Sequence, residues 1–141
     1  MTKNLDNEGL KSIVDNYDIF YIDLWGVVHN GITLHHNAIQ ALEKIAGLKK
    51  NYVLLTNAPR PNKIVKGFLE KMGMKKEIRD NVYSSGEAAL SYLKQNHLDE
   101  KFFHIGPPRD FDLFLDFKKN ISKDIDQSSY LLCTGLFEDE D

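Results

Sequence analysis

The chain has 141 residues, of which 42% are hydrophobic and 11% aromatic, so a disordered protein is excluded and a domain with a core is expected. Its formal net charge of −3 argues against a general nucleic-acid or membrane-surface role. The sequence contains neither an apolar signal segment nor a run near the roughly 20 residues of a membrane span. Because Cys133 has no second cysteine to pair with, we expect a cytoplasmic protein in which Cys133 is a small core residue.

The first predicted strand covers residues 19–22, after a short helical lead-in at residues 10–14. Its sequence, Ile-Phe-Tyr-Ile, has the composition of a strand buried on both faces. Asp23 stands at the expected end of this strand, and residues 30–34 predict a turn and the return arm of a small hairpin-like flap. Ligands of open α/β sheets bind outside the carboxyl ends of the strands. Asp23 is therefore either placed for chemistry or is a turn or capping residue.

A second strand with a polar end follows the flap. Apolar residues at spacings of three and four predict a helix over residues 38–46. The next strand is predicted over residues 52–55, and it ends in the hydroxyl of Thr56 and the amide of Asn57. These two side chains therefore stand at the same kind of sheet edge as Asp23.

The alternation of strand and helix continues. Pro61 is suited to the start of a helix, whose apolar stripe ends at Gly73. A short strand over residues 81–83 leads to Ser84 and Glu87, which have the spacing of a capping box at the start of a helix. This order of elements favours an α/β fold with a parallel sheet and helices on its faces.

The pattern then restarts in the last third of the chain. The further predicted elements are a strand at 101–105, a short helix at 110–117 with Leu113, Phe114 and Phe117 inward, and a strand at 130–134. The last strand would be an open edge, which favours self-association or a partner chain.

Three segments together resemble a known family. Asp23-Leu24-Trp25-Gly26-Val27, followed by Asn30-Gly31, resembles the first motif of the haloacid dehalogenase (HAD) superfamily of phosphotransferases. Residues 54–60, Leu-Leu-Thr-Asn-Ala-Pro-Arg, resemble its second motif. Residues 83–89 are similar to the segment that leads to the inserted α/β cap in subfamily IIA. The resemblance covers the chain but only the front half of the family's length.

This resemblance implies a three-layer α/β/α Rossmann-like core with a parallel sheet, of which residues 1–98 would be the front half. Residues 99–141 would begin the α/β cap. The implied activity is Mg²⁺-dependent hydrolysis of a small phosphorylated metabolite, with Asp23 as the nucleophile that forms an aspartyl-phosphate. The carboxylate of Asp23 and the backbone carbonyl of Trp25 would hold Mg²⁺, which prefers oxygen ligands.

The resemblance also implies the phosphate contacts and one departure. The Thr56 hydroxyl and the Asn57 N–H would bind the phosphate, and Gly26 would let the chain turn sharply. The family usually has an acid–base Asp where this sequence has Trp25, and an indole cannot do that work. General acid–base catalysis contributes about 10²–10⁴-fold, so we expect slow turnover. His29, on the flap, is either a substitute for this group or a solvated turn histidine.

The family's third motif, a lysine, and its fourth, an acidic pair that completes the metal site, lie in the second half of the fold. We expect both to be missing from this chain. The acidic run Glu138–Asp141 resembles an acidic pair on paper, but the preceding residues match the cap region. We therefore expect a weak or inactive phosphatase fragment. Two alternatives stay open: a non-catalytic HAD-like binding or interaction module, and a phosphoacceptor receiver domain with Asp23 as acceptor.

Overall fold

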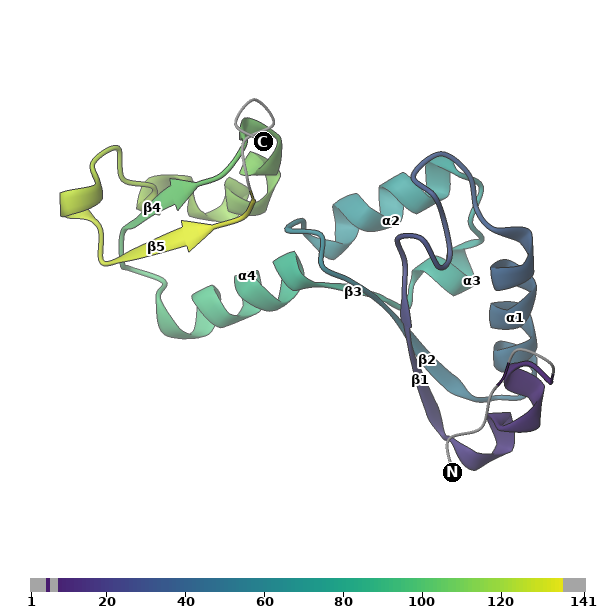
Figure 1. The fold of residues 1–141 in the computed structure, drawn as a ribbon. Coiled ribbons are helices and arrows are strands. Elements are labelled where there is room, and N and C mark those ends of the chain that lie inside the picture. The colour runs from purple at the N-terminus through teal and green to yellow at the C-terminus, as the bar shows by residue number, and fades with distance from the viewer. Residues whose placement is uncertain (1–4, 6–7, 136–141) are drawn as a thin grey trace. The chain divides into compact units, whose positions relative to one another are not determined.

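The computed structural model describes residue 5 and residues 8–135. The chain divides into two compact units, the first formed by residues 1–56 and 68–82 and the second by residues 57–67 and 83–141. Figure 1 shows the order of the elements along the chain by colour and label. The predicted α/β class with parallel strands is confirmed.

Three strands form the first sheet, in the order β1-β2-β3. Their bounds are Ile19–Asp23 for β1, Asn51–Thr56 for β2 and Val82–Ser84 for β3. β1 and β2 run parallel, with Tyr21 beside Val53 and Asp23 beside Leu55. All three predicted strands of this region are confirmed to within a residue at each end.

The helices follow the strands in the predicted order (Figure 1). Their bounds are His36–Gly47 for α1, Asn62–Lys71 for α2, Lys76–Arg79 for α3 and Ser85–Asn96 for α4. The one-turn helix α3 was not predicted, because four residues are too few to show a helical period. The expected helical lead-in is replaced by two 3₁₀ turns, Leu10–Ser12 and Val14–Asn16.

The composition of β1 predicted a strand buried on both faces, but one face of this strand is exposed. Ile19 is 43% exposed and Tyr21 is 66% exposed, whereas Phe20 and Ile22 are half-buried. Ile22 lies beside the fully buried Leu54 of β2, so these residues share the covered face of the sheet. β1 stands at the edge of the sheet, and its other face is open to solvent in the described part of the first unit.

The second unit contains a pair of parallel strands, β4 (Phe102–Ile105) and β5 (Tyr130–Cys133). Between them the predicted helix at 110–117 is a longer 3₁₀ segment, Pro108–Asn120, whose backbone leaves helical geometry at Phe117. Its three predicted inward residues are all buried. They join a core made of Leu90, Leu93, Phe102, Leu113, Phe114 and Phe117.

The outer side of β5 is exposed, and Cys133 is exposed with it. The prediction of a core cysteine is therefore wrong, because alternation along β5 places Leu131 and Cys133 together on the open face. The predicted edge strand is confirmed: among the described elements β5 pairs with β4 alone. The acidic run Glu138–Asp141 lies outside the described residues. Within the described ranges, no helix combines the length and apolar character that crossing a bilayer requires.

Candidate functional site

Asp23 is the last residue of β1, and its side chain is exposed. One carboxylate oxygen, Oδ1, accepts a hydrogen bond from the backbone N–H of Leu24 at 2.8 Å. Because β1 and β2 are parallel and Asp23 lies beside Leu55, Thr56 stands one residue further along the same edge of the sheet. The structure thus places two of the predicted site residues, Asp23 and Thr56, at one carboxyl edge.

The chain turns back sharply after Asp23. The Leu24 carbonyl accepts hydrogen bonds from the N–H groups of Val28 at 2.9 Å and His29 at 3.1 Å. Gly26 has a φ of 75°, a left-handed conformation that favours glycine, so the sharp turn predicted there is confirmed. Within the described part of the chain, no hydrogen bond reaches the Trp25 carbonyl. This oxygen therefore remains available to a cation.

The predicted hairpin-like flap follows this turn. His29 and Leu34 form an antiparallel bridge. The side-chain oxygen of Asn30 accepts hydrogen bonds from the backbone N–H groups of Ile32 at 3.0 Å and Thr33 at 2.8 Å. These short-range bonds fix the loop that stands above the end of β1.

Two aromatic rings enclose His29 within this loop. Trp25 is 63% exposed, and its ring covers Gly31 so closely that a Cβ atom there would lie 2.6 Å from the indole. The His29 ring meets Trp25 edge-on at 5.6 Å and Phe68 at 5.8 Å, measured between ring centroids. His29 is 5% exposed. The solvated-turn interpretation of His29 is therefore wrong.

The environment of His29 also bears on its use as a base. Burial lowers the pKa of His29, and the neighbouring His35 lowers it further, whereas Asp23 opposes both effects. The Nδ1 atom of His29 already accepts a hydrogen bond from the N–H of Gly31 at 3.0 Å. The remaining nitrogen then carries the proton in the neutral ring, so His29 has no unoccupied acceptor for a catalytic proton.

The chemistry of the oxygens near Asp23 can be compared with the ligands that magnesium prefers. Mg²⁺ prefers octahedral oxygen coordination and often keeps several waters, and the Asp23 carboxylate and the Trp25 carbonyl fit that preference. In the described ranges, no group of three or more His, Cys, Asp or Glu residues could hold a metal ion. Further ligands would have to come from water, substrate or other residues.

The loop after Thr56 is held against the start of α4 by hydrogen bonds. The Ser84 hydroxyl donates to the carbonyl of Arg60 at 2.6 Å, and the Ser85 hydroxyl donates to the carbonyl of Asn57 at 2.8 Å. A Cβ atom at Gly86 would lie 2.3 Å from the backbone nitrogen of Arg60. The position of Asn57, the predicted phosphate-binding residue, is therefore set by a helix nearly thirty residues later in the sequence.

The predicted capping box is half confirmed. The Ser84 hydroxyl accepts a hydrogen bond from the Glu87 N–H at 3.1 Å and caps α4. The motif also predicted a return bond from the Glu87 side chain to Ser84, and this bond does not form. Its carboxylate accepts from the N–H of Asn62 at 2.9 Å, while the Asn62 side chain accepts from the N–H of Ser84 at 2.9 Å. The bond between Glu87 and Asn62, at the start of α2, therefore takes the place of the return bond within the capping box.

A second group of polar side chains gathers at the carboxyl ends of β4 and β5. His104 Nε2 and Thr134 Oγ1 are 2.8 Å apart. Asp110 is buried, and the Arg60 guanidinium lies 3.9 Å from Asp110 and 3.7 Å from Asp112. Burial lowers the pKa of His104, and Asp110 partly opposes that shift. Sequence reasoning missed this cluster, because its members are far apart in the chain and belong to no local period.

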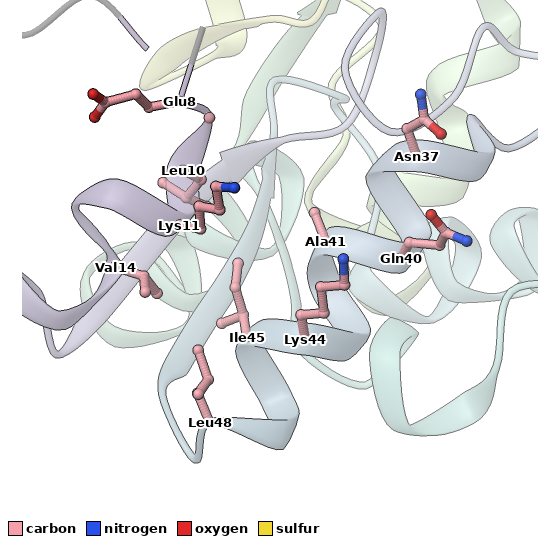
Figure 2. Close-up of a pocket in the computed structure, with 11 residues that line it drawn as sticks. Glu8, Leu10, Lys11, Val14, Asn37, Gln40, Ala41, Lys44, Ile45 and Leu48 are labelled. Atoms are coloured by element: carbon pink, nitrogen blue, oxygen red, sulfur yellow. The ribbon is translucent and has the colours of Figure 1, made fainter. Parts of the chain in front are cut away.

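A cavity of about 300 Å³ lies elsewhere in the first unit, between the 3₁₀ turns before β1 and helix α1 (Figure 2). Apolar side chains of Leu10, Val14, Ala41, Ile45 and Leu48 contribute to its lining. None of the predicted site residues lines this cavity. It is therefore separate from the chemistry expected at Asp23.

The family whose sequence pattern matches the chain is described as haloacid dehalogenase-like hydrolase, and the match covers residues 20–117. A solved structure of a haloacid dehalogenase-like hydrolase from Brucella suis 1330 is similar to the chain, with a TM-score of 0.77 and 30% sequence identity. That similarity covers 92% of this chain and 46% of the other.

Two phosphatases of lower identity share the fold. A p-nitrophenyl phosphatase from Archaeoglobus fulgidus has a TM-score of 0.63 at 19% identity, covering 81% of this chain and 43% of its own. A glycerol phosphate phosphatase from Mycobacterium tuberculosis, in complex with magnesium, has a TM-score of 0.62 at 19% identity. This similarity covers 89% of this chain and 38% of the other. The chain thus spans less than half the length of these structures. Among curated proteins, no sequence matches it.

Proposed function

Because the chain belongs to the family of haloacid dehalogenase-like hydrolases, we propose that it carries the nucleophile part of a subfamily IIA phosphatase for a small phosphorylated metabolite. The observation that carries this proposal is the exposed carboxylate of Asp23 at the end of β1, followed by the left-handed turn at Gly26. We assign residues 1–98 to the core of such an enzyme and residues 99–141 to the beginning of its cap.

In the proposed reaction the Asp23 carboxylate attacks phosphorus. A bond forms between a carboxylate oxygen and phosphorus, and the bond to the alcohol oxygen breaks as the alcohol leaves with a proton from solvent. Water then attacks the aspartyl-phosphate and releases phosphate with a free Asp23. The Thr56 hydroxyl and the Asn57 N–H position the transferring group, which is the main contribution that a protein makes to phosphoryl transfer.

Magnesium is the cation that the proposal requires. The Asp23 carboxylate and the Trp25 carbonyl would hold it, and when bound it offsets the negative charge of the phosphate. Support comes from the free carbonyl of Trp25 and from the exposed carboxylate beside it. Since these two residues provide a partial site, we propose weak binding of Mg²⁺ by this chain.

Slow turnover is part of the proposal. Trp25 occupies the position of the acid–base residue, and the acceptor nitrogen of His29 is already bonded to Gly31. Neither side chain can then protonate the leaving alcohol efficiently. A loss of about 10²–10⁴-fold is expected when such a group is missing.

The test is turnover of p-nitrophenyl phosphate with Mg²⁺ by the chain and by three variants. We expect weak activity that Asp23→Asn abolishes, whereas Asp18→Asn, an exposed acid just before β1, leaves it unchanged. Trp25→Asp should raise turnover at least about tenfold, because it returns an acid–base group. Equal rates for the chain and Asp23→Asn, together with no gain in Trp25→Asp, would overturn the proposal.

A non-catalytic interaction module is the second candidate. It is favoured by Trp25 and by the open edge of β5, where Leu131 and Cys133 are exposed. The unpaired backbone groups of such an edge can pair with a strand of a second copy or of a partner chain. Sedimentation over a hundredfold concentration range should then show self-association. A concentration-independent monomer whose Trp25→Asp variant hydrolyses phosphate esters would exclude this second function.

A further inference from the structure

The cavity beside α1 has two walls of apolar side chains. One wall is a face of α1 and of its C-terminal end, where Ala41, Ile45 and Leu48 recur at spacings of three and four. The opposite wall comes from the 3₁₀ turns and contributes Leu10 and Val14. Val14 and Ile45 are 7% and 3% exposed, whereas Leu48 is 52% exposed. The cavity therefore has a buried apolar base and reaches the surface of the first unit.

Two lysines line this cavity, one on each wall. Lys11 belongs to the 3₁₀ turns and Lys44 to the last turn of α1, and both are exposed (Figure 2). Among the residues that the structure describes, neither ammonium group has an ion pair or a hydrogen bond. Glu8 also contributes to the lining, but Figure 2 shows its carboxylate pointing away from both lysines. The cavity therefore combines an apolar base with two unpaired positive charges.

This combination suits an apolar anion. A lysine ammonium can donate a charge-assisted hydrogen bond to a carboxylate, and the apolar walls favour the removal of a hydrocarbon chain from water. The exposed amides of Asn37 and Gln40 supply further donors at the rim. A sugar or a nucleotide would leave polar groups without partners against these walls. We propose that this cavity binds a medium-chain fatty acid, with the carboxylate at Lys11 and Lys44 and the chain in the apolar base.

The volume of the cavity sets the length of the chain. An apolar cavity of about 150 Å³ binds benzene, which has six carbon atoms. At about 300 Å³, this cavity has room for about twelve non-hydrogen atoms by the same ratio. Octanoate, with eight carbons and two oxygens, fits this space, and decanoate fills it. Affinity should therefore rise with chain length up to decanoate and then level off, because further methylenes would stay in water.

The fatty-acid site is independent of the proposed phosphatase reaction. Neither Asp23 nor Thr56 lines the cavity, and binding of a carboxylate by lysines requires no Mg²⁺. The site can therefore be tested by binding alone, and its failure would leave the proposal for Asp23 as it stands.

The experiment is a titration of the ¹⁵N-labelled chain with octanoate, followed by the backbone amide signals of Val14, Ala41 and Ile45. Octanoate should give saturable shifts of these signals, while the signal of Phe102 in the second unit should not move. Hexanoate should bind at least about tenfold more weakly, because each buried methylene contributes about fourfold in affinity. The neutral 1-octanol should also bind at least about tenfold more weakly, since it has the same chain but no charge for the lysines.

Three variants with a matched control complete the test. Lys11→Gln and Lys44→Gln should each weaken octanoate binding about tenfold, whereas Lys71→Gln, at an exposed lysine in the last turn of α2, should leave it unchanged. Ala41→Leu should fill the base and weaken octanoate and 1-octanol alike, in a chain whose other amide signals show that it is folded. Equal affinity for octanoate and 1-octanol, unchanged affinity in both lysine variants, or no saturable shift would overturn the proposal.

Discussion

The two parallel strand pairs of this molecule present opposite kinds of polar edge. At the end of β1 the Asp23 carboxylate is exposed, whereas beyond the ends of β4 and β5 the Asp110 carboxylate is buried. An exposed carboxylate can meet a phosphate and a cation. A buried carboxylate is better suited to accept hydrogen bonds from particular donor groups that take the place of water. Parallel topology places polar residues at an edge, but burial decides what they can do there.

The strands behind these edges differ in the same way. β1 has Tyr21 66% exposed on its open face, whereas Phe102 of β4 is fully buried against Phe114. The second unit has an aromatic core around its short sheet, and the first unit leaves one sheet face to solvent. Parallel sheets are usually covered on both faces. The open face of β1 is therefore a surface that another structural element would stabilise.

The largest expected effect comes from the aromatic core. Phe114→Ala should lower the free energy of unfolding by about 3–5 kcal/mol, the usual cost of a large cavity. Tyr21→Ala, on the open face of β1, should lower it by less than about 0.5 kcal/mol. Chemical denaturation measures both. Similar losses in the two variants would contradict the contrast between a packed and an open sheet face.

A smaller effect is expected from two adjacent serines. Ser84 is 1% exposed, caps α4 and donates to the Arg60 carbonyl, so Ser84→Ala should cost about 2 kcal/mol. Ser85 is exposed and makes its side-chain bonds at the surface. Ser85→Ala should therefore cost less than half as much. Thermal unfolding of the two variants compares them directly, and a larger loss in Ser85→Ala would refute this ranking.

Much of this architecture could be predicted from local patterns. The strands, the helices α1, α2 and α4, and the inward faces of Leu113 and Phe114 follow from periodicity, and the turn at Gly26 follows from the family resemblance. Two of the failures, at His29 and Glu87, involve partners that are distant in the sequence. One of the rings that bury His29 belongs to Phe68, and the Glu87 carboxylate accepts a hydrogen bond from the N–H of Asn62. No short-range pattern can indicate either contact.

The next effect concerns the loop above Asp23. Gly31 has a φ of 89°, and Gly31→Ala should cost about 1–2 kcal/mol through backbone strain. The added Cβ must also displace the ring of Trp25, the single tryptophan. A shift in tryptophan fluorescence should report this movement. Gly26→Ala has the same kind of strain but no atom within 4 Å of the new Cβ, so its folded-state fluorescence should change less.

The smallest expected effect is a pH dependence. The pKa of His29 is lowered in the folded chain from its ordinary value of 6.5, chiefly by burial, so protonation favours the unfolded state. Its contribution to stability is complete above that ordinary value and is lost as the pH falls toward the lowered folded pKa. His29→Gln should reduce the fall in stability between neutral and mildly acidic pH. The exposed control His36→Gln should keep it, and a steeper fall in His29→Gln would contradict the burial of this ring.

Gly86 affects how function tolerates mutation, and not only how stable the fold is. Its missing side chain lets the start of α4 meet the backbone of Arg60, where a Cβ atom would come within 2.3 Å. Any other residue at this position would push away the loop that carries Arg60 and Asn57. A mutational scan would then score Gly86 among the ligand-binding positions, although it contacts no ligand. Sequence comparisons that consider only contact residues would overlook the position on which the placement of this loop depends.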